Sequence, residues 1–202
     1  MKHYFTNDQD TKSNESEFKV TILDKNFKFI TDNGIFSKGE LDEASRLLIE
    51  TFNKLQLTGT LLDVGCGYGA IGLTLAANRA DEVHMTDINL RALSLTKRNA
   101  ILNNLNNVTI YESFCYDKVT QRFAHILSNP PIRAGKKIVH QIITESINHL
   151  TDAGTLTIVI GKQHGAASAA KKMTEIFGNA KRIERKKGFW ILQSVKVDEK
   201  EA

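Results

Sequence analysis

Apolar and polar residues alternate along this chain with two different periods, which predict two kinds of element. Near the start, a period of two predicts a β-hairpin made of residues 18–22 and 27–31, with its turn at residues 23–26. Apolar residues then recur at helical spacing, and Gly59 ends this segment. The apolar face of the predicted helix consists of Leu41, Ala44, Leu47, Leu48, Phe52 and Leu55.

From residue 60 onward, short apolar runs alternate with helical patterns. Strands are predicted at residues 61–64, 83–86, 108–111, 124–127 and 156–160. Helices are predicted at residues 70–77, 90–103, 137–150 and 166–177. Residues 182–185 and 189–196 predict a terminal antiparallel hairpin. This order indicates an α/β fold: a mostly parallel, seven-stranded, Rossmann-like sheet with helices on both faces, an antiparallel C-terminal edge hairpin and an additional N-terminal hairpin.

The composition sets the size of the fold. The chain has 202 residues, of which 41% are hydrophobic, and this is enough for one substantial core. We expect a single domain over residues 17–197, a flexible segment at residues 1–16 and a tail at residues 198–202. A monomer is compatible with this length, and the sequence leaves the oligomeric state open.

Neither a membrane partner nor a metal site is expected. No apolar run is long enough to span a membrane, and the polar start lacks the apolar stretch of a signal peptide. The expected location is therefore the cytoplasm. Cys66 and Cys115 lack the spacing of a metal site, and two cysteines make no disulfide framework, so both are expected to be free thiols.

Positive charge is concentrated in the last third of the chain. Residues 131–196 contain twelve Lys or Arg against four Asp or Glu, a net charge of +8, whereas the remainder carries −4. This asymmetry favours a polyanionic partner such as a nucleic acid, and ordinary solvated lysines are the alternative.

A glycine-rich turn lies between a predicted strand and a predicted helix. It reads Asp63-Val64-Gly65-Cys66-Gly67-Tyr68-Gly69, and glycines there let the backbone approach a ligand closely. Asp87 ends the next strand, 22 residues beyond Gly65, where a carboxylate can accept both hydroxyls of a ribose. The pattern indicates a bound nucleoside.

Two nucleoside cofactors are compatible with this turn. Gly65, Gly67 and Ala70 satisfy the dinucleotide pattern of NAD-binding proteins. Asp63 favours S-adenosylmethionine (SAM) instead, because its carboxylate would repel a pyrophosphate but attract the amino group of a methionine. Gly69 favours SAM as well, since it gives a tighter turn.

Asn129-Pro130-Pro131 follows the fourth predicted strand of the sheet, at the edge where ligands of open α/β folds bind. The prolines fix φ and remove backbone donors, which leaves mainly acceptors. The Asn129 side-chain oxygen and the Pro130 carbonyl can together accept hydrogen bonds from one planar amino group. Such a site suits methyl transfer to an exocyclic amine, which needs positioning more than a strong base. The alternative is a rigid loop at a strand end.

With these motifs, the chain resembles the class I SAM-dependent methyltransferases, and among them the RsmC-like group that methylates guanine N2 in small-subunit ribosomal RNA. The resemblance covers about residues 27–196. Besides the glycine loop, Asp87 and the Asn-Pro-Pro motif, it rests on Gly34-Ile35-Phe36-Ser37-Lys38-Gly39-Glu40-Leu41-Asp42 and on Lys162-Gln163-His164-Gly165. The first of these two segments is the more specific to the group.

The resemblance implies roles for individual residues. Phe36 and Ser37 would border the cofactor pocket, and Asp87 would bind the ribose. Ile88 would pack on the adenine. The methionine moiety would be held by Asp63, Gly65, Cys66, Gly67 and Gly69. The adenine edge would meet Ser113 and Phe114, with Glu112 as a rival. Asn129, Pro130 and Pro131 would grip the target amine, with Asn129 also bordering the cofactor.

The sequence departs from the group at two points. Ile132 stands where many relatives have an aromatic residue that stacks on the target base, and the extra N-terminal domain of two-domain relatives is absent from this sequence. Ile132, Arg133, Lys136 and Lys137 are predicted to contact the substrate. A second cationic group, Lys181, Arg182, Arg185, Lys186 and Lys187, is either a phosphate-binding or a solvated surface. His164 either contacts the substrate or cofactor, or has only a structural role.

The sequence thus predicts a SAM-dependent N-methyltransferase acting on ribosomal RNA or the small ribosomal subunit, most simply at guanine N2. Methylation of a glutamine amide or of DNA adenine uses the same Asn-Pro-Pro chemistry and remains open. A NAD-dependent oxidoreductase is disfavoured because no catalytic Tyr-Lys or His pair is found. A noncatalytic SAM- or RNA-binding module is disfavoured because Asp63, Asn129 and Pro130 are all present.

Overall fold

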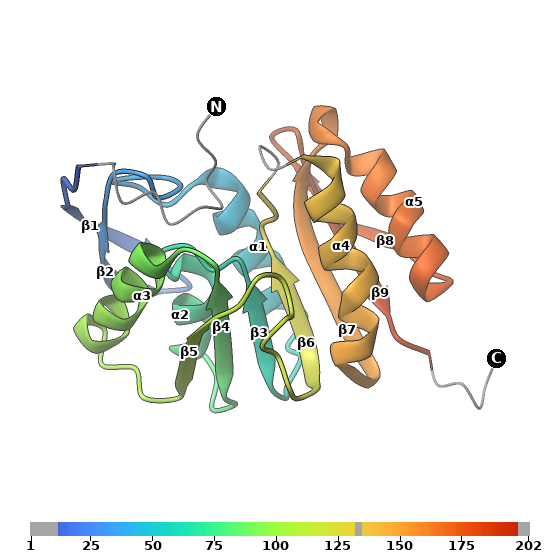
Figure 1. Ribbon diagram of the computed structural model, residues 1–202, viewed down its shortest axis with the longest axis horizontal. Helices are drawn as coiled ribbons and strands as arrows, with labels where there is room; N and C mark the ends of the chain where they lie inside the picture. Colours follow the sequence, from blue (N-terminus) through green and yellow to red (C-terminus); the bar gives the residue numbers. More distant parts are fainter. Residues whose placement is uncertain (1–11, 132–134, 198–202) are drawn as a thin grey trace.

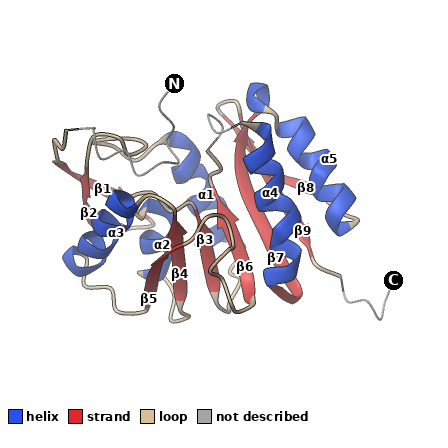
Figure 2. Ribbon diagram, in the orientation of Figure 1, coloured by secondary structure: helices blue, strands red, loops and turns tan. Residues whose placement is uncertain are grey.

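A seven-stranded sheet forms the centre of the computed structural model, which describes residues 12–131 and 135–197 (Figures 1 and 2). The strand order is β5-β4-β3-β6-β7-β9-β8. Its strands are β3 Leu61–Val64, β4 Val83–Asp87, β5 Val108–Glu112, β6 Phe123–Ser128, β7 Leu150–Gly161, β8 Lys181–Lys186 and β9 Phe189–Val195. The strands from β5 to β7 pair in parallel, and β9 is antiparallel to both neighbours. The predicted sheet and its edge hairpin are confirmed.

Helices cover both faces of the sheet, as predicted. They are α1 Glu43–Lys54, α2 Ala70–Ala76, α3 Leu90–Leu102, α4 Lys136–Ser146 and α5 Ala166–Phe177, with short 3-10 helices η2 Ile147–His149 and η3 Lys162–His164. Leu61 packs in a core with residues of α1, α2 and α3, whereas Leu62 packs in a second core with residues of α4 and α5. Successive strand side chains point to opposite faces, which separates the two cores. Within the described ranges, no helix is long and apolar enough to cross a membrane.

The N-terminal hairpin consists of β1 Ser16–Ile22 and β2 Lys25–Thr31 and forms a sheet of its own. Phe18 and Phe29 pack edge-on against Tyr68 of the glycine loop, with ring centroids 6.0 and 5.5 Å away. Asn99 of α3 accepts from the Ile30 backbone N–H at 2.8 Å and donates to the Ile30 carbonyl at 3.0 Å. The hairpin is thereby fixed against the glycine loop and α3.

β7 begins six residues earlier than predicted, and α4 ends four residues earlier. Near the start of β7, Thr151, Asp152 and Ala153 face solvent, whereas Leu150 and the residues from Gly154 onward are buried. Because the stretch from Thr151 to Thr155 carries no run of large apolar residues, the pattern showed only the apolar remainder of the strand. Residues 147–149 tighten into η2, and buried Leu150 pairs with Phe123 instead of continuing the helix.

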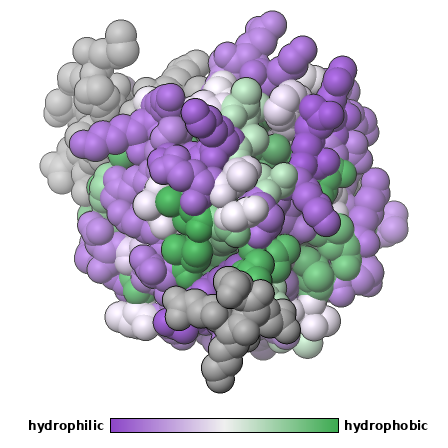
Figure 3. Space-filling model, turned by 90° about the vertical axis from the view of Figure 1, so that its right-hand side faces the viewer, coloured by the Kyte–Doolittle hydropathy of each residue, from purple (hydrophilic) through white to green (hydrophobic). Residues whose placement is uncertain are grey.

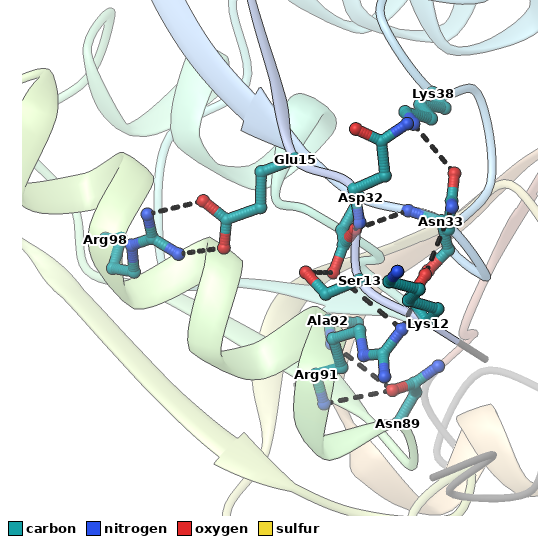
Figure 4. Close-up of polar contacts among 11 residues, drawn as sticks. Lys12, Ser13, Glu15, Asp32, Asn33, Lys38, Asn89, Arg91, Ala92 and Arg98 are labelled. Atoms are coloured by element: carbon teal, nitrogen blue, oxygen red, sulfur yellow. Dashed lines mark hydrogen bonds and ion pairs between the residues drawn. The ribbon is translucent and has the colours of Figure 1, made fainter. Parts of the chain in front are cut away.

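Asp32 connects three segments near the N-terminal side of the molecule (Figure 4). Its carboxylate accepts hydrogen bonds from Ser13 Oγ at 2.8 Å and from the Asn14 N–H at 2.6 Å. Arg91, at the start of α3, lies 3.7 Å from the same carboxylate and donates to the Asn33 carbonyl at 3.1 Å. Burial acts to raise the pKa of Asp32, but these hydrogen bonds and the charge of Arg91 together lower it.

The segment preceding β1 also contacts α3 directly. Glu15 and Arg98 form a bidentate ion pair at 2.6 and 2.9 Å (Figure 4). Both side chains are almost half exposed, so solvent screens this pair. Asp32 therefore contributes more than Glu15 to holding the segment in place.

We expect Asp32→Ala to lower the free energy of unfolding by roughly 2 kcal/mol, because it removes a buried, charged acceptor that receives hydrogen bonds from Ser13, Asn14 and Asn33. Glu15→Ala, which breaks the exposed pair, should cost less than about 1 kcal/mol. Urea denaturation of both variants measures the difference. Equal losses would contradict the central position of Asp32.

Candidate active site

A cavity of about 560 Å³ opens at the carboxyl edge of the sheet. Residues that follow β3, β4, β5, β6 and β7 line it, together with the start of α1 and the first residue of β9. Parallel strands bring their carboxyl ends to one edge, so motifs far apart in sequence meet there. The cavity is the candidate active site.

The glycine loop is held by backbone hydrogen bonds to β4. The N–H groups of Gly65 and Cys66 both donate to the Thr86 carbonyl, at 2.8 and 2.9 Å. Gly65 and Gly67 have φ values of 76° and 58°, and a Cβ added to either would meet no atom within 4 Å. The loop thus presents bare backbone to open space, which is the arrangement that lets a ligand approach.

Asp87 ends β4 beside this loop. Its carboxylate accepts from the Gly67 N–H at 2.9 Å and from the Asn89 N–H at 2.8 Å. Burial raises the pKa of Asp87, and the hydrogen bonds from Asn89 and Gly67 partly offset that effect. The Ile88 N–H contributes a further hydrogen bond, and a carboxylate has about four acceptor positions, so capacity remains for a ligand hydroxyl.

Asp63 lies behind the loop and does not line the cavity. It is fully buried, and its Oδ2 accepts from the Gly72 N–H of α2 at 2.9 Å. Its Oδ1 has no hydrogen-bond partner among the residues that the structure describes. Burial raises the pKa of Asp63 to about 7, and the nearby charge of Asp87 adds to the increase.

Asn129 occupies the middle of the cavity wall, directly after β6. Ser128 Oγ donates to the Val64 carbonyl at 2.8 Å and ties the end of β6 to the end of β3. The Asn129 Nδ2 group donates to Ser45 Oγ at 3.1 Å and to Asp42 Oδ1 at 3.4 Å. Asp42 is also the N-cap of α1, because the same oxygen accepts from the Ser45 N–H at 2.9 Å.

The far end of the cavity is formed by η3 and the start of β9. Phe189 pairs with Gly161 across the β7–β9 ladder. A Cβ on Gly161 would lie 2.5 Å from His164 Nδ1, so the His164 ring lies directly over the glycine. His164 and Phe189 both line the cavity, with Ile138 and Ile142 of α4. This end is therefore more apolar than the end near Asp87.

The model of the methyltransferase small domain family matches residues 26–193. This chain belongs to that family. The Bacillus subtilis protein YbxB is 46% identical to the chain over 199 residues, which are 97% of this chain and 99% of that protein. The family assignment makes the chain a SAM-dependent methyltransferase and confirms the predicted cofactor.

Relatives with named activities match a shorter part of their own length. Ribosomal RNA small subunit methyltransferase C of Aeromonas hydrophila is 38% identical over 131 residues, and these cover 62% of this chain and 37% of that protein. The solved structure of the Thermus thermophilus 16S rRNA N2 G1207 methyltransferase (RsmC), in complex with AdoMet and guanosine, has a TM-score of 0.82 at 24% identity. That comparison covers 90% of this chain and 50% of the solved chain, and it shows a shared fold.

The cavity fits SAM by its shape and its chemistry. The open space over Gly65 and Gly67 admits a ligand against the backbone, and Asp87 has free acceptor capacity for a ribose. Ile88 and Phe114 offer apolar surface for a purine. The negative charge of Asp87 also matches a cationic cofactor.

Most of the predicted cofactor and acceptor residues are gathered in this cavity. Its lining includes Phe36, Gly65, Cys66, Gly67, Asp87, Ile88, Ser113, Phe114, Asn129, Pro130 and Pro131. Ser37 lies outside the lining and donates to the Glu40 carbonyl, and Gly69 packs against Leu73 and Thr96. Glu112, the rival to Ser113, forms an ion pair with Lys118 instead.

The predicted substrate contacts are described only in part. Lys136 and Lys137 are exposed in the first turn of α4, outside the cavity lining. Ile132 and Arg133 lie outside the described residues. These four roles stay predictions.

The cavity lining also includes Asp42, Ser45 and Asn89, which the motifs do not predict. Asp42 immediately precedes a helical apolar pattern, which is the signal of an N-cap, and Asn89 likewise caps α3. The sequence signal predicts a helix cap, but it does not indicate which other element the capping side chain contacts. Phe189 gave no signal beyond that of a strand residue.

Asp63 should make the unfolding free energy decrease as pH rises. The folded state keeps a proton up to about pH 7, whereas an ordinary aspartate releases it near 3.8. This contribution to stability is present below the lower value and is lost as pH rises through the higher one. Urea denaturation at about pH 5 and about pH 8 should therefore show the wild type losing stability relative to Asp63→Asn, which does not titrate.

The comparison with Asp63→Asn separates Asp63 from other groups that titrate in this range. His125 is one of them, because burial lowers its pKa. A wild-type-minus-variant difference that is the same at both pH values would contradict the raised pKa of Asp63.

Proposed function

We propose that this methyltransferase acts on an exocyclic amino nitrogen, and that its target is guanine N2 in small-subunit ribosomal RNA. The observation that carries the proposal is the orientation of the Asn129 amide, which the start of α1 fixes from one side. The predicted pair of acceptors, Asn129 Oδ1 and the Pro130 carbonyl, suits an amine with two protons.

The chemistry of Asp42 determines which way the Asn129 amide points. An ionised carboxylate only accepts hydrogen bonds, so the amide must turn its NH₂ group toward Asp42. Ser45 Oγ takes the second position on the same side. Among the described residues, Asn129 Oδ1 has no recorded donor. The oxygen is therefore left as an acceptor for a ligand.

Two acceptors on one amino group favour methyl transfer for a simple reason. The lone pair of an aryl amine or amide is delocalised, and it becomes available as the nitrogen approaches tetrahedral geometry. Asn129 Oδ1 and the Pro130 carbonyl would hold both N–H bonds during that change. When bound, SAM supplies an electrophilic methyl group on a sulfonium. The chain's part is then to align the nitrogen and to exclude water with Ile138, Ile142 and Phe189.

The RNA target is supported by relatives and by charge. Several relatives are named as ribosomal RNA small subunit methyltransferases. The net charge of +8 over residues 131–196 suits a polyanion, and Lys136 and Lys137 follow the acceptor motif closely in the chain. A glutamine amide in a protein and an adenine in DNA share the amine chemistry, so the assay below includes both.

Ser45→Ala tests the fixed orientation of Asn129. Loss of one neutral hydrogen bond of about 1 kcal/mol should lower turnover about 5-fold without weakening SAM binding. Ser146→Ala is the matched control, because Ser146 is also buried but its Oγ donates to the Ile143 carbonyl, outside the cavity. Steady-state kinetics with ribosomal RNA measure both. Similar turnover for Ser45→Ala and Ser146→Ala would contradict the positioning role.

Asn129→Ala tests the reaction itself. Methyl transfer from radiolabelled SAM is measured to isolated small ribosomal subunits, free ribosomal RNA, genomic DNA and a release-factor protein. We expect label in the RNA-containing samples, recovered as N2-methylguanine after digestion. Asn129→Ala should reduce turnover by about 100-fold or more, with little change in SAM binding. Label only in DNA or protein would contradict the RNA target, and equal losses in turnover and SAM binding would contradict the acceptor role.

A further inference from the structure

The sheet order divides the cavity into two halves on either side of Asn129. β3 and β4, which precede the glycine loop and Asp87, lie on one side of β6, whereas β7 and β9 lie on the other. The residues that suit SAM belong to the first half. The second half is bounded by His164, which follows β7, and by Phe189, which begins β9. A target base next to Asn129 and opposite the cofactor must therefore face this second half.

We propose that Phe189 binds the target nucleotide and that three lysines at the mouth of the cavity, Lys162, Lys186 and Lys187, bind its flanking phosphates. This inference rests on the proposed function and names the part of the chain that holds the RNA. Phe189 packs on the base within the cavity. The three lysines, called here the lysine edge, bind the backbone phosphates at its mouth.

The lysine edge is a single piece of structure that adjoins Phe189. The Lys162 N–H donates to the Gly188 carbonyl at 2.8 Å, which joins η3 to the turn between β8 and β9. Lys187 and Gly188 form that turn with φ values of 50° and 81°. All three lysines are exposed, and Phe189 is half-buried directly after the turn. A phosphate bound at the turn would thus lie next to Phe189, which follows Gly188 directly in the chain and lines the cavity.

The charge at this edge is net positive. Lys187 Nζ lies 2.7 Å from Glu43 Oε2 at the start of α1, and both side chains are more than half exposed. Arg46 and Glu50 form a neighbouring pair at 3.7 Å. The hydrogen bond and charge of Lys187 lower the pKa of Glu43, with smaller contributions from Arg46 and Lys186. In residues 12–131 and 135–197, neither Lys162 nor Lys186 lies within ion-pair distance of a carboxylate.

The chemistry of an aromatic ring beside a row of cations matches an unpaired nucleotide. Bases of single-stranded RNA stack on aromatic side chains, and lysines bind the phosphates in a salt-dependent manner. The residue after the prolines is Ile132, so Phe189 and His164 are the aromatic rings at this end of the cavity in the described part of the chain. On the molecular face with α5 and β8, hydrophilic side chains surround a smaller hydrophobic area (Figure 3).

Salt dependence of RNA binding tests the lysine edge. A Lys162→Ala, Lys186→Ala, Lys187→Ala triple variant should reduce the slope of log affinity against log salt for small-subunit ribosomal RNA by about 2 units, because each neutralised phosphate contributes about 0.7 to that slope. The matched control replaces Lys19, Lys97 and Lys171, which are exposed on β1, α3 and α5, with alanine. It removes the same charge and should leave the slope unchanged. Equal effects of the two triples, or competition by polyglutamate as effective as competition by RNA, would overturn the proposal.

Phe189 is tested by three variants in the methyl-transfer assay. Phe189→Leu keeps an apolar side chain, removes the ring and should lower kcat/KM for RNA about 10- to 100-fold, with unchanged SAM binding by calorimetry. Phe189→Tyr should restore most of the activity, and Phe177→Leu, at the buried end of α5, should retain it. If Phe189→Leu retains wild-type kcat/KM, the proposal is overturned. Absence of RNA methylation by the wild type would instead overturn the function on which it rests.

Discussion

The parallel pairing of β3 with β4 and β6 is the constraint on which the site depends. It brings the glycine loop, Asp87 and Asn129 to one edge of the sheet, although at least 60 residues separate the loop from Asn129 along the chain. Hydrogen bonds from Gly65, Cys66 and Gly67 to the end of β4 fix the loop. The Ser128 hydroxyl fixes the end of β6 against β3. Small shifts at this edge would misplace all three motifs together.

The elements that precede the sheet complete the site from outside it. The N-terminal hairpin packs on Tyr68 of the glycine loop, and Asp32 joins the segment before β1 to the start of α3. Asp42 has two roles, because its carboxylate caps α1 and orients the Asn129 amide. The stability of α1 and the geometry of the acceptor site therefore share one carboxylate. Asp42 therefore belongs to the site although it is distant from Asn129 in the sequence.

Charge is arranged differently at the two ends of the cavity. Carboxylates lie at the end that suits a cationic cofactor, with Asp87 at the wall and Asp63 buried behind it. Burial raises the pKa of both groups, so negative charge there is unfavourable without a cation nearby. At the opposite end, beyond Phe189, three exposed lysines outnumber Glu43, which pairs with Lys187. The sheet separates these environments by keeping β4 and β9 on opposite sides of β6.

The sequence by itself determined the α/β class, the parallel sheet with its edge hairpin, and the main cofactor and acceptor motifs. Periodicity and turn chemistry are local properties, so they are visible in a single chain. It did not reveal the start of β7, because the solvent-facing residues there leave no apolar pattern. It also could not show that Asp63 lies behind the loop, that Asp42 and Ser45 orient Asn129, or that Phe189 reaches the cavity. Only the tertiary structure decided these points, since each depends on which side chains from distant segments meet once the strands have paired.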